Sequence, residues 1–487
     1  MISRSIASFL TSLEEVNTIT PRASLPTYAL ISVHGDPTAD IGKEGAGGQN
    51  IYVRQLGLGL AQQGARVDIF TRRESPDQAE IVELAPGCRT IRLTAGPAQF
   101  IPRTELFEYL PDFVAAWLDF QQRSGRRYNL VHTNYWLSGW VGLQLKFRLG
   151  LPLVHTYHSI GAVKYQNLSD PPAIAAVRHG VEWACLEQAD RIIATSPQEE
   201  ADMRRLLSRH GRVQVIPCGI DTQHFSAVTR YEARQQLGLD PQRSLLLYAG
   251  RFDERKGIET LVRACAQLSD PYQLYLVGGA RPGGQDNQEQ ERIRALVTEL
   301  GLADVTTFTG RIDQAQLPPY YAAADICIVP SYYEPFGLVA IEAMAAGTPV
   351  IASAVGGLNY TVIPHKTGCL VPPRDVSALA QAITRLLQNP EHRLAYGTAA
   401  QQWVKANFSC DGVARQVLHL YQTLTLKESL KTARIGQGLS AELAAQLQAL
   451  IESKGIKPTG SQALDQWLQT LGRKAPSTVV PAQRLAS

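Results

Sequence analysis

The chain lacks any long hydrophobic run and any marked excess of charge of one sign. Its 487 residues contain 47 Lys and Arg against 44 Asp and Glu, which gives a formal net charge of only +3. So small a charge gives no reason to expect binding to nucleic acid or to an anionic membrane. Because nowhere do about 18 apolar residues run together, no membrane-spanning helix is expected. The N-terminus carries Arg4, Glu14 and Glu15 and is not typical of a secretory signal.

Paired cysteines and paired metal-binding carboxylates are also lacking. The seven cysteines are odd in number, far apart and never spaced as a metal or redox pair; they are Cys88, Cys185, Cys218, Cys265, Cys327, Cys369 and Cys410. They are expected to be reduced core residues, which favours a cytoplasmic setting. No loop carries a DxD-like carboxylate pair, so no metal ion is expected to be essential.

The first half of the sequence alternates short apolar runs with helical patterns, as in a β-α-β unit. A helix over 51–63 is expected to bury one face and to end at Gly64. Strands are expected at 28–34, 66–71, 129–133, 151–157, 191–196 and 213–217.

The alternation of short apolar runs with helical patterns begins again in the second half of the sequence. Strands are expected at 244–250, 273–279, 305–310, 325–330 and 348–353. The chain is too long for one core, so we predict an α/β protein with two Rossmann-like, doubly wound parallel-sheet domains that face a central cleft. Ligands of such sheets bind beyond the carboxyl ends of the strands, so the cleft should hold two ligands. The predicted parts are 1–217, 218–410, a helix over 411–432 that returns to the first domain, and a helical tail over 433–487 of unknown role.

A diphosphate site is predicted in the segment AGRFDERKG. Arg251 and Lys256 follow the end of a buried strand at Gly250 and precede a helix that begins near Gly257. Two cations and the free N–H groups of such a turn are what a diphosphate requires. The alternative interpretation is two solvated surface cations that flank a turn.

A second site segment is SYYEPFGLVAIEA. Gly337 and Leu338 would present backbone N–H groups at a helix N-terminus, where a phosphate is stabilised. Glu334 in the loop and Glu342 in the helix could hydrogen-bond sugar hydroxyls. The alternative is one surface glutamate and one helix-cap glutamate.

This segment resembles the E-x7-E motif of the retaining GT-B glycosyltransferases of family four. AGRFDERKG, VGG and FTGRID support the resemblance, which covers roughly residues 28–425. It implies a nucleotide-sugar donor whose diphosphate is held by Arg251 and Lys256, with Glu342 on the ribose and Glu334 on the transferred hexose. The backbone near Arg311 and Ile312 would meet the base. The rest of the implied donor set is Gly48, Gly278, Phe336, Gly337, Leu338 and Val339.

His158 follows a strand in VHTYHSIGAVK and could hydrogen-bond a donor hydroxyl or stabilise positive charge at the anomeric carbon. Taken alone it would more often be an ordinary loop residue. The resemblance implies an active-site histidine, which makes the catalytic set His158, Glu334, Arg251 and Lys256. It also implies retention of configuration by front-face attack, with no dedicated protein base.

The resemblance implies that the acceptor is a sugar phosphate, because family members that act on such acceptors use a Lys six residues after the active-site histidine, and Lys164 follows His158 by six residues here. Gly47 and Gly48 permit close approach of a ligand to the backbone, although they could simply cap a flexible loop. The cations among the expected contacts suit a dianionic phosphate. These contacts are Gly48, Gln49, Arg103, Tyr135, Ser159, Lys164 and Arg178.

Two subfamilies fit. Sucrose-phosphate synthases carry DTGGQ, whereas inositol-phosphate glycosyltransferases of the mycothiol pathway carry AGGMN. This chain has AGGQN, in which Ala46 and Asn50 resemble the second subfamily and Gln49 the first. The expectation is transfer of glucose from UDP-glucose to fructose 6-phosphate, with the phosphorylated disaccharide released because no phosphatase-like domain is recognised. Sucrose synthase, a nucleotide-sugar epimerase and a non-catalytic nucleotide-sugar sensor are the alternatives. Preference for UDP-glucose over ADP-glucose and the oligomeric state stay open.

Overall fold

The computed structural model describes residues 25–39, 47–165, 171–240, 243–279 and 285–436. It divides into two compact units, Met1–His419 and Leu420–Ser487. Most of the expected tail, from residue 437 onward, lies outside the described residues. Within them, no helix combines the length and apolar character needed to cross a membrane.

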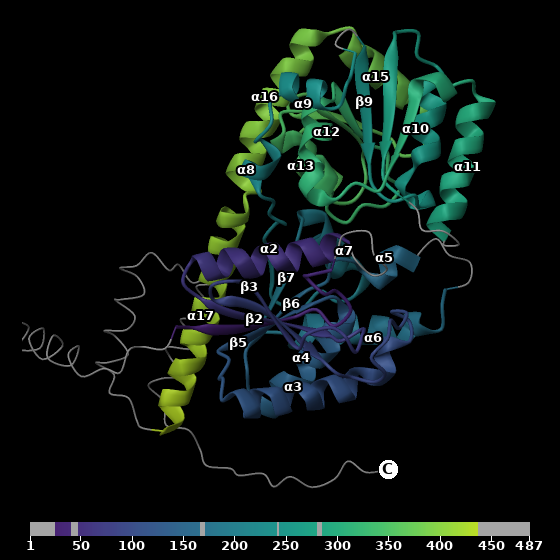
Figure 1. Ribbon diagram of the computed structural model, residues 1–487. Helices are drawn as coiled ribbons and strands as arrows, with labels where there is room; N and C mark the ends of the chain where they lie inside the picture. Colours follow the sequence, from purple (N-terminus) through teal and green to yellow (C-terminus); the bar gives the residue numbers. More distant parts are fainter. Residues whose placement is uncertain (1–24, 40–46, 166–170, 241–242, 280–284, 437–487) are drawn as a thin grey trace, which may run out of the picture. The chain divides into compact units, whose positions relative to one another are not determined.

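An eight-stranded sheet forms from the first half of the chain (Figure 1). Its strand order is β3-β4-β2-β1-β5-β6-β7-β8, and every neighbouring pair is parallel except β3 with β4. The strands are β1 (Thr27–Ile31), β2 (Arg66–Arg72), β3 (Ile81–Ala85), β4 (Cys88–Leu93), β5 (Leu130–Asn134), β6 (Leu153–Thr156), β7 (Arg191–Ala194) and β8 (Val213–Val215).

Helices cover this sheet, and its central strands are buried along their whole length, as expected of a parallel sheet. On one face, side chains of α3, α4 and α6 share a hydrophobic core with the strands. The helix α2 packs closely on β2 and β4, because a Cβ on Gly57 would lie 2.8 Å from Ile69 and 3.1 Å from Cys88. The helices are α2 (Gly48–Gln62), α3 (Leu110–Ser124), α4 (Trp136–Leu149), α5 (Gly161–Tyr165), α6 (Ile174–Gln188) and α7 (Pro197–Leu206), with a 3-10 turn over Leu106–Tyr109.

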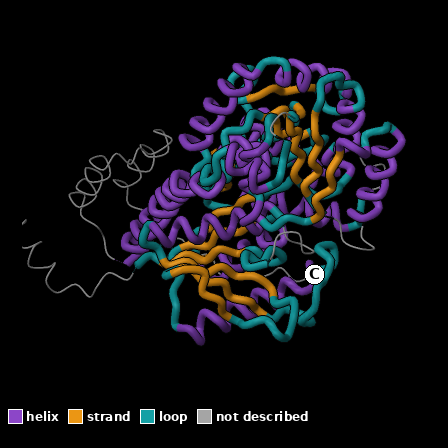
Figure 2. The backbone as a smooth tube through the Cα atoms, turned by 45° about the horizontal axis from the view of Figure 1, so that its top comes forward, coloured by secondary structure: helices purple, strands orange, loops and turns teal. Residues whose placement is uncertain are grey.

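A six-stranded, wholly parallel sheet forms from the second half, with strand order β11-β10-β9-β12-β13-β14. Figure 2 shows its strands enclosed by helices. The strands are β9 (Ser244–Ala249), β10 (Tyr272–Val277), β11 (Thr306–Gly310), β12 (Ile326–Val329), β13 (Val350–Ser353) and β14 (Gly368–Val371).

The helices of the second sheet form two groups. In one, α10 packs against α11 and α15, and the three share a core with the strands; in the other, α12 packs against α9 and α13 against α16. The helices are α8 (Thr222–Phe225), α9 (Arg230–Gln236), α10 (Ile258–Cys265), α11 (Gln285–Glu299), α12 (Pro318–Ala323), α13 (Leu338–Ala345), α14 (Leu358–Thr361), α15 (Val376–Leu387), α16 (Pro390–Asn407) and α17 (Cys410–Gly436). Three 3-10 turns lie over Glu254–Lys256, Ala303–Val305 and Gln314–Gln316.

The prediction of two parallel-sheet α/β domains is confirmed, and each expected strand is present. The helix expected over 51–63 is α2, and Gly64 follows it with φ +86°. At the start of α17, the backbone oxygen of Asp411 accepts a hydrogen bond from Gln63 at 3.2 Å. The boundaries at 217, 410 and 432 stay predictions. All seven cysteines are free thiols.

Candidate functional site

Glycines end three neighbouring strands of the six-stranded sheet. Gly250 and Gly278 directly follow β9 and β10, and Gly310 ends β11. The Gly278 N–H donates to Gly310 O at 3.1 Å, and a Cβ on Gly278 would lie 1.9 Å from Gly250 O. No side chain fits between these strand ends, so a ligand can approach the backbone closely there.

The loops after β9 and β12 bring predicted donor residues together. Lys256 ends a 3-10 turn, and its Nζ lies 2.5 Å from Oε2 of Glu334, a residue 78 positions along the chain. Arg251 is half exposed, and its nearest carboxylate is Asp253 at 3.8 Å. A cation that is weakly paired in the protein remains able to pair with a diphosphate. The predicted grouping of Arg251, Lys256 and Glu334 is therefore sterically consistent with one site.

The N-terminus of α13 offers free backbone donors. Gly337 is its N-cap with φ +97°, and a Cβ there would lie 2.6 Å from Leu358, so only glycine fits. No side chain caps this helix, and the N–H groups of Leu338 and Val339 belong to its first turn, where intrahelical partners are lacking. These donors and the helix dipole suit a phosphate. Phe336 is 5% exposed and packs on Phe408, so it can offer only its backbone.

Glu342 lies inside α13 and is only 4% exposed. Tyr321 donates its hydroxyl to Glu342 Oε2 at 2.8 Å. Burial raises the pKa of Glu342 to about 7, and the Tyr321 hydrogen bond opposes that rise. One carboxyl oxygen is thus committed to Tyr321, and the other is available to a sugar hydroxyl.

The predicted base contacts follow β11. A Cβ on Gly279 would lie 2.7 Å from the backbone nitrogen of Arg311, so the chain after β10 touches the chain after β11. The Arg311 side chain is 41% exposed and lies 3.6 Å from Asp313. The backbone of Arg311 therefore lies beside the row of glycines, and contact of Arg311 and Ile312 with the base stays a prediction.

His158 follows β6 in a left-handed conformation, with φ 59°. Its Nε2 lies 2.9 Å from Oδ1 of Asn134, the last residue of β5. The amide nitrogen of Asn134 donates to Ile31 O at 3.4 Å, so the amide oxygen faces the imidazole and Nε2 must be the protonated nitrogen. Burial lowers the pKa of His158 to about 3. The ring is therefore neutral at pH 7, with a lone pair on Nδ1.

Asn134→Asp is expected to raise the pKa of His158 by roughly 1–3, because a carboxylate at the position of the amide favours the imidazolium. NMR titration of the histidine ring measures this change. Asn389→Asp makes the same charge change at the N-cap of α16 and should leave the His158 pKa unaltered. An unchanged pKa in Asn134→Asp would contradict the assigned hydrogen bond.

The side chains of Gln49 and Asn50, at the start of α2, form hydrogen bonds with neighbouring segments of the predicted acceptor site. Gln49 donates to Ser32 Oγ at 3.0 Å and to Asn134 O at 3.4 Å. Asn50 accepts from the Gly47 N–H at 3.0 Å and donates to Asp36 O at 2.9 Å. Asn50 thus joins Gly47 to Asp36, and Gln49 lies close to the strand that ends at Asn134. Gly48 is exposed at the first position of α2.

Arg178 differs most from its expected environment. It is fully buried, and its Nε lies 2.7 Å from Glu182 Oε1, which is itself fully buried. Its other nitrogens donate to the Tyr135 hydroxyl at 3.1 Å and to the Ser159 backbone oxygen at 2.5 Å. The structure therefore brings Tyr135, Ser159 and Arg178 together, but with the arginine charge already paired. Direct contact of Arg178 with an acceptor stays a prediction.

Lys164 and Arg103 are the exposed cations of the predicted acceptor set. Neighbouring protein removes part of the hydration of Lys164, and this desolvation, followed by the positive charge of Arg178, lowers its pKa to about 8. Arg103 adds a further positive field, which also acts on His34. No side-chain partner of Arg103 is found among the described residues.

Sequence reasoning missed three residues at these sites: Asn134, Tyr321 and His34. His34 is 7% exposed, packs against Tyr135 in a tilted arrangement with 4.6 Å between ring centroids, and has a buried Nδ1 that lacks a hydrogen-bond partner among the described residues. Asn134 ends β5 and His34 follows β1, so the rule that ligands bind at the carboxyl ends of strands could have indicated them. Nothing local indicates Tyr321, because its partner is 21 residues away.

Two family models match the chain. Residues 47–219 match the glycosyl transferase 4-like domain, and residues 229–403 match the glycosyl transferases group 1. D-inositol 3-phosphate glycosyltransferase 2 of Catenulispora acidiphila is 39% identical over 384 residues, 76% of this chain and 89% of that protein. D-inositol 3-phosphate glycosyltransferase of Kineococcus radiotolerans is 36% identical over 423 residues, 82% of this chain and 96% of that protein.

Solved structures add a different relative. Sucrose-phosphate synthase of Thermosynechococcus elongatus is 53% identical, with a TM-score of 0.78 over 82% of this chain and 100% of that one. HepE of Anabaena, solved in complex with UDP and glucose, is 22% identical, with a TM-score of 0.65 over 82% of this chain and 100% of that one. The second likeness concerns the fold alone.

Proposed function

Because the chain belongs to the group 1 glycosyl transferases, with a glycosyl transferase 4-like domain before that part, we propose that it transfers glucose from UDP-glucose to fructose 6-phosphate. The products would be sucrose 6-phosphate and UDP. The expected membership of the GT-B glycosyltransferases is confirmed, so the epimerase and the non-catalytic sensor are not carried further. The observation that carries the substrate proposal is the 53% identity to a sucrose-phosphate synthase along the whole of that chain.

The donor would lie along the carboxyl edge of the six-stranded sheet. The row of glycines after β9, β10 and β11 leaves room for the nucleotide, and the free N–H groups at α13 suit its diphosphate. Glu342 would accept a ribose hydroxyl, and Glu334 a hydroxyl of glucose. Because Lys256 already contacts Glu334 at 2.5 Å, it can bridge the hexose and the diphosphate.

The chemical step requires stabilisation of the departing UDP. Negative charge builds on the diphosphate as the anomeric carbon becomes oxocarbenium-like, and Arg251 and Lys256 would offset it. We propose retention of configuration, with the acceptor hydroxyl attacking from the face that the diphosphate leaves. A leaving phosphate oxygen would take the acceptor proton, which suits a site where neutral His158 donates Nε2–H to Asn134.

The acceptor would lie at the carboxyl edge of the eight-stranded sheet. Lys164 and Arg103 are the exposed cations that could meet a sugar phosphate, and His34 and Tyr135 lie beside them with polar atoms. The described residues contain no group of three or more His, Cys, Asp or Glu side chains arranged to hold a metal ion. Independence from metal stays a proposal.

Transfer to an inositol phosphate is the second candidate, since curated relatives at 36% and 39% identity carry that name. Both candidates use a phosphate on the acceptor, so the cations alone do not distinguish them. Gln49 is one of the loop residues on which the two subfamilies differ, and it matches the sucrose-phosphate synthases. Its amide is held by Ser32 next to Asn134, which supports a role in shaping the acceptor pocket.

An acceptor panel tests the proposal. With UDP-glucose, fructose 6-phosphate is expected to release UDP at least about 100-fold faster than fructose, because a site built for a charged group rejects an analogue that leaves its groups unpaired. It is also expected to release UDP faster than inositol 3-phosphate, which carries a phosphate as well, because the pocket beside Gln49 would be shaped for the fructose ring. ADP-glucose in place of UDP-glucose measures the base preference, and a parallel assay in EDTA measures the need for metal. Faster release with inositol 3-phosphate would overturn the proposed acceptor.

A further inference from the structure

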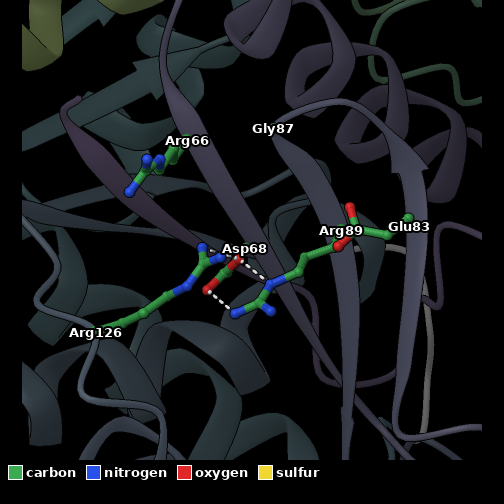
Figure 3. A pocket seen from close by; sticks show the side chains of 6 residues that line it. All are labelled: Arg66, Asp68, Glu83, Gly87, Arg89 and Arg126. Carbon is green, nitrogen blue, oxygen red and sulfur yellow. Dashed lines mark hydrogen bonds and ion pairs between the residues drawn. The ribbon is translucent and has the colours of Figure 1, made fainter. Parts of the chain in front are cut away.

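A pocket of about 350 Å³ lies in the eight-stranded sheet domain, away from the residues discussed so far. Arg66, Asp68, Glu83, Gly87, Arg89 and Arg126 line it (Figure 3). Arg66 begins β2 and Cys88 begins β4, and both strands run parallel to β1, β5 and β6. The pocket is therefore at the amino-terminal edge of the sheet. Seven-residue β2 spans roughly 20 Å, which separates this pocket from the edge that carries His158.

Asp68 fixes the positions of two of the arginines. Its side chain is fully buried. Arg89 donates from Nε to Asp68 Oδ1 at 2.7 Å and from Nη2 to Oδ2 at 3.1 Å, and Arg126 donates from Nη1 to Oδ1 at 2.9 Å. The Tyr128 hydroxyl donates to it at 2.6 Å. Figure 3 shows the two guanidinium groups reaching Asp68 from opposite sides. With all these donors, Asp68 is satisfied and has no need of a further cation.

The arginines still have unused donors. Arg89 has committed only Nε and one Nη2 hydrogen, and Arg126 only one Nη1 hydrogen, out of the five N–H groups that each guanidinium carries. Arg66 is exposed and has no side-chain partner among the described residues. Three guanidinium groups against the two carboxylates of Asp68 and Glu83 leave one net positive charge around the pocket.

We propose that this pocket binds a phosphate dianion, either free or carried by a small phosphomonoester. Guanidinium groups match phosphate oxygens with paired N–H donors, and two of these groups are already held in place by Asp68, so little side-chain entropy is lost on binding. Arg66 closes the site from β2. Exposed Glu83 at the rim can accept a hydroxyl from an ester but offers nothing to free phosphate.

Calorimetric titration with inorganic phosphate and with glycerol phosphate tests the site. The full chain carrying Lys164→Ala is the background, because this change removes a cation of the proposed acceptor site. In that background, phosphate binding is expected to persist, and Arg66→Gln with Arg126→Gln should weaken it at least about tenfold. Equal affinity for both probes identifies free phosphate as the source; tighter binding of the ester identifies a phosphomonoester.

Arg127→Gln is the matched control, since it removes one positive charge from the same loop outside the pocket and should leave the affinity unchanged. Arg66→Gln alone keeps every hydrogen bond of Asp68 intact, so it tests the site without loss of that cluster. Absence of phosphate binding in the Lys164→Ala background, or binding that survives the double substitution, overturns the proposal. Because the readout is binding, a failure here is distinct from a failure of the acceptor panel.

Discussion

Lys256→Ala is expected to lower kcat by about two to three orders of magnitude, the usual loss when a charge-stabilising group is removed from a transition state. Lys256 is the cation that contacts Glu334, so its loss would remove the charge proposed to face the diphosphate and would leave Glu334, the proposed hexose contact, without its cation. The KM for UDP-glucose should rise much less than kcat falls, since the charge on the departing diphosphate builds only during reaction. Steady-state release of UDP measures both quantities.

Arg255→Ala is the matched control in the same turn. The Arg255 guanidinium donates to the two carboxyl oxygens of Asp253 at 2.9 and 2.5 Å. Its replacement by alanine is therefore expected to lower kcat less than tenfold. Lys256 and Glu334 are 27% and 15% exposed, so loss of their ion pair should cost no more than about 1 kcal/mol of stability. A kcat loss below tenfold in folded Lys256→Ala would remove Lys256 from the catalytic set.

Arg178→Met is expected to destabilise the chain by about 3–5 kcal/mol, because it leaves the carboxyl of Glu182 buried without its cation. Burial already raises the pKa of Glu182, and the Arg178 charge is the strongest opposing influence. The double variant Arg178→Met with Glu182→Leu should recover most of this stability, since neither charge then remains buried. The urea midpoint of unfolding measures both variants.

Arg205→Met is the control for that comparison. Arg205 pairs with Asp202 on α7 at 2.9 Å, but its side chain is 60% exposed, so its replacement should change stability by less than about 1 kcal/mol. A stable Arg178→Met single variant would contradict the structural role. The acceptor KM of the recovered double variant then reports whether Arg178 also contacts substrate, as its place in the sequence predicted.

The fold followed from hydrophobic runs because buried parallel strands leave a strong signal, and each of those runs is a strand. The antiparallel strands β3 and β4 contain no such hydrophobic run. Pro86 and Gly87 separate the two strands, and charged residues alternate with their apolar ones. β14 is only four residues long, and its sequence GCLV contains a glycine. β3 and β14 are edge strands, which bury less surface than central ones, so their sequences are less constrained. β4 is largely buried, but Arg89 and Arg92 interrupt its apolar residues.

The candidate site was predictable where one segment carried the chemistry, and less so where segments from distant positions meet. Lys256 and Glu334 were each singled out locally, but their direct contact depends on the order of β9 and β12 in the sheet. The sequence predicts Arg178 as an acceptor cation, and this stays a prediction. Glu182 follows Arg178 by four residues, a spacing that places both on one helix face, and this pair is the sequence signal for the buried ion pair.

The loops that carry Lys256 and Glu334 are joined by backbone contacts of the protein itself. The Tyr332 N–H donates to Arg255 O at 2.7 Å, and Gly257 approaches so closely that a Cβ there would lie 2.0 Å from Pro330 O. The conformational entropy of bringing these loops together is therefore lost once, during folding, and not at each turnover. Nucleotide-sugar association should accordingly proceed in a single kinetic phase, without a slow step in which the diphosphate loop becomes ordered.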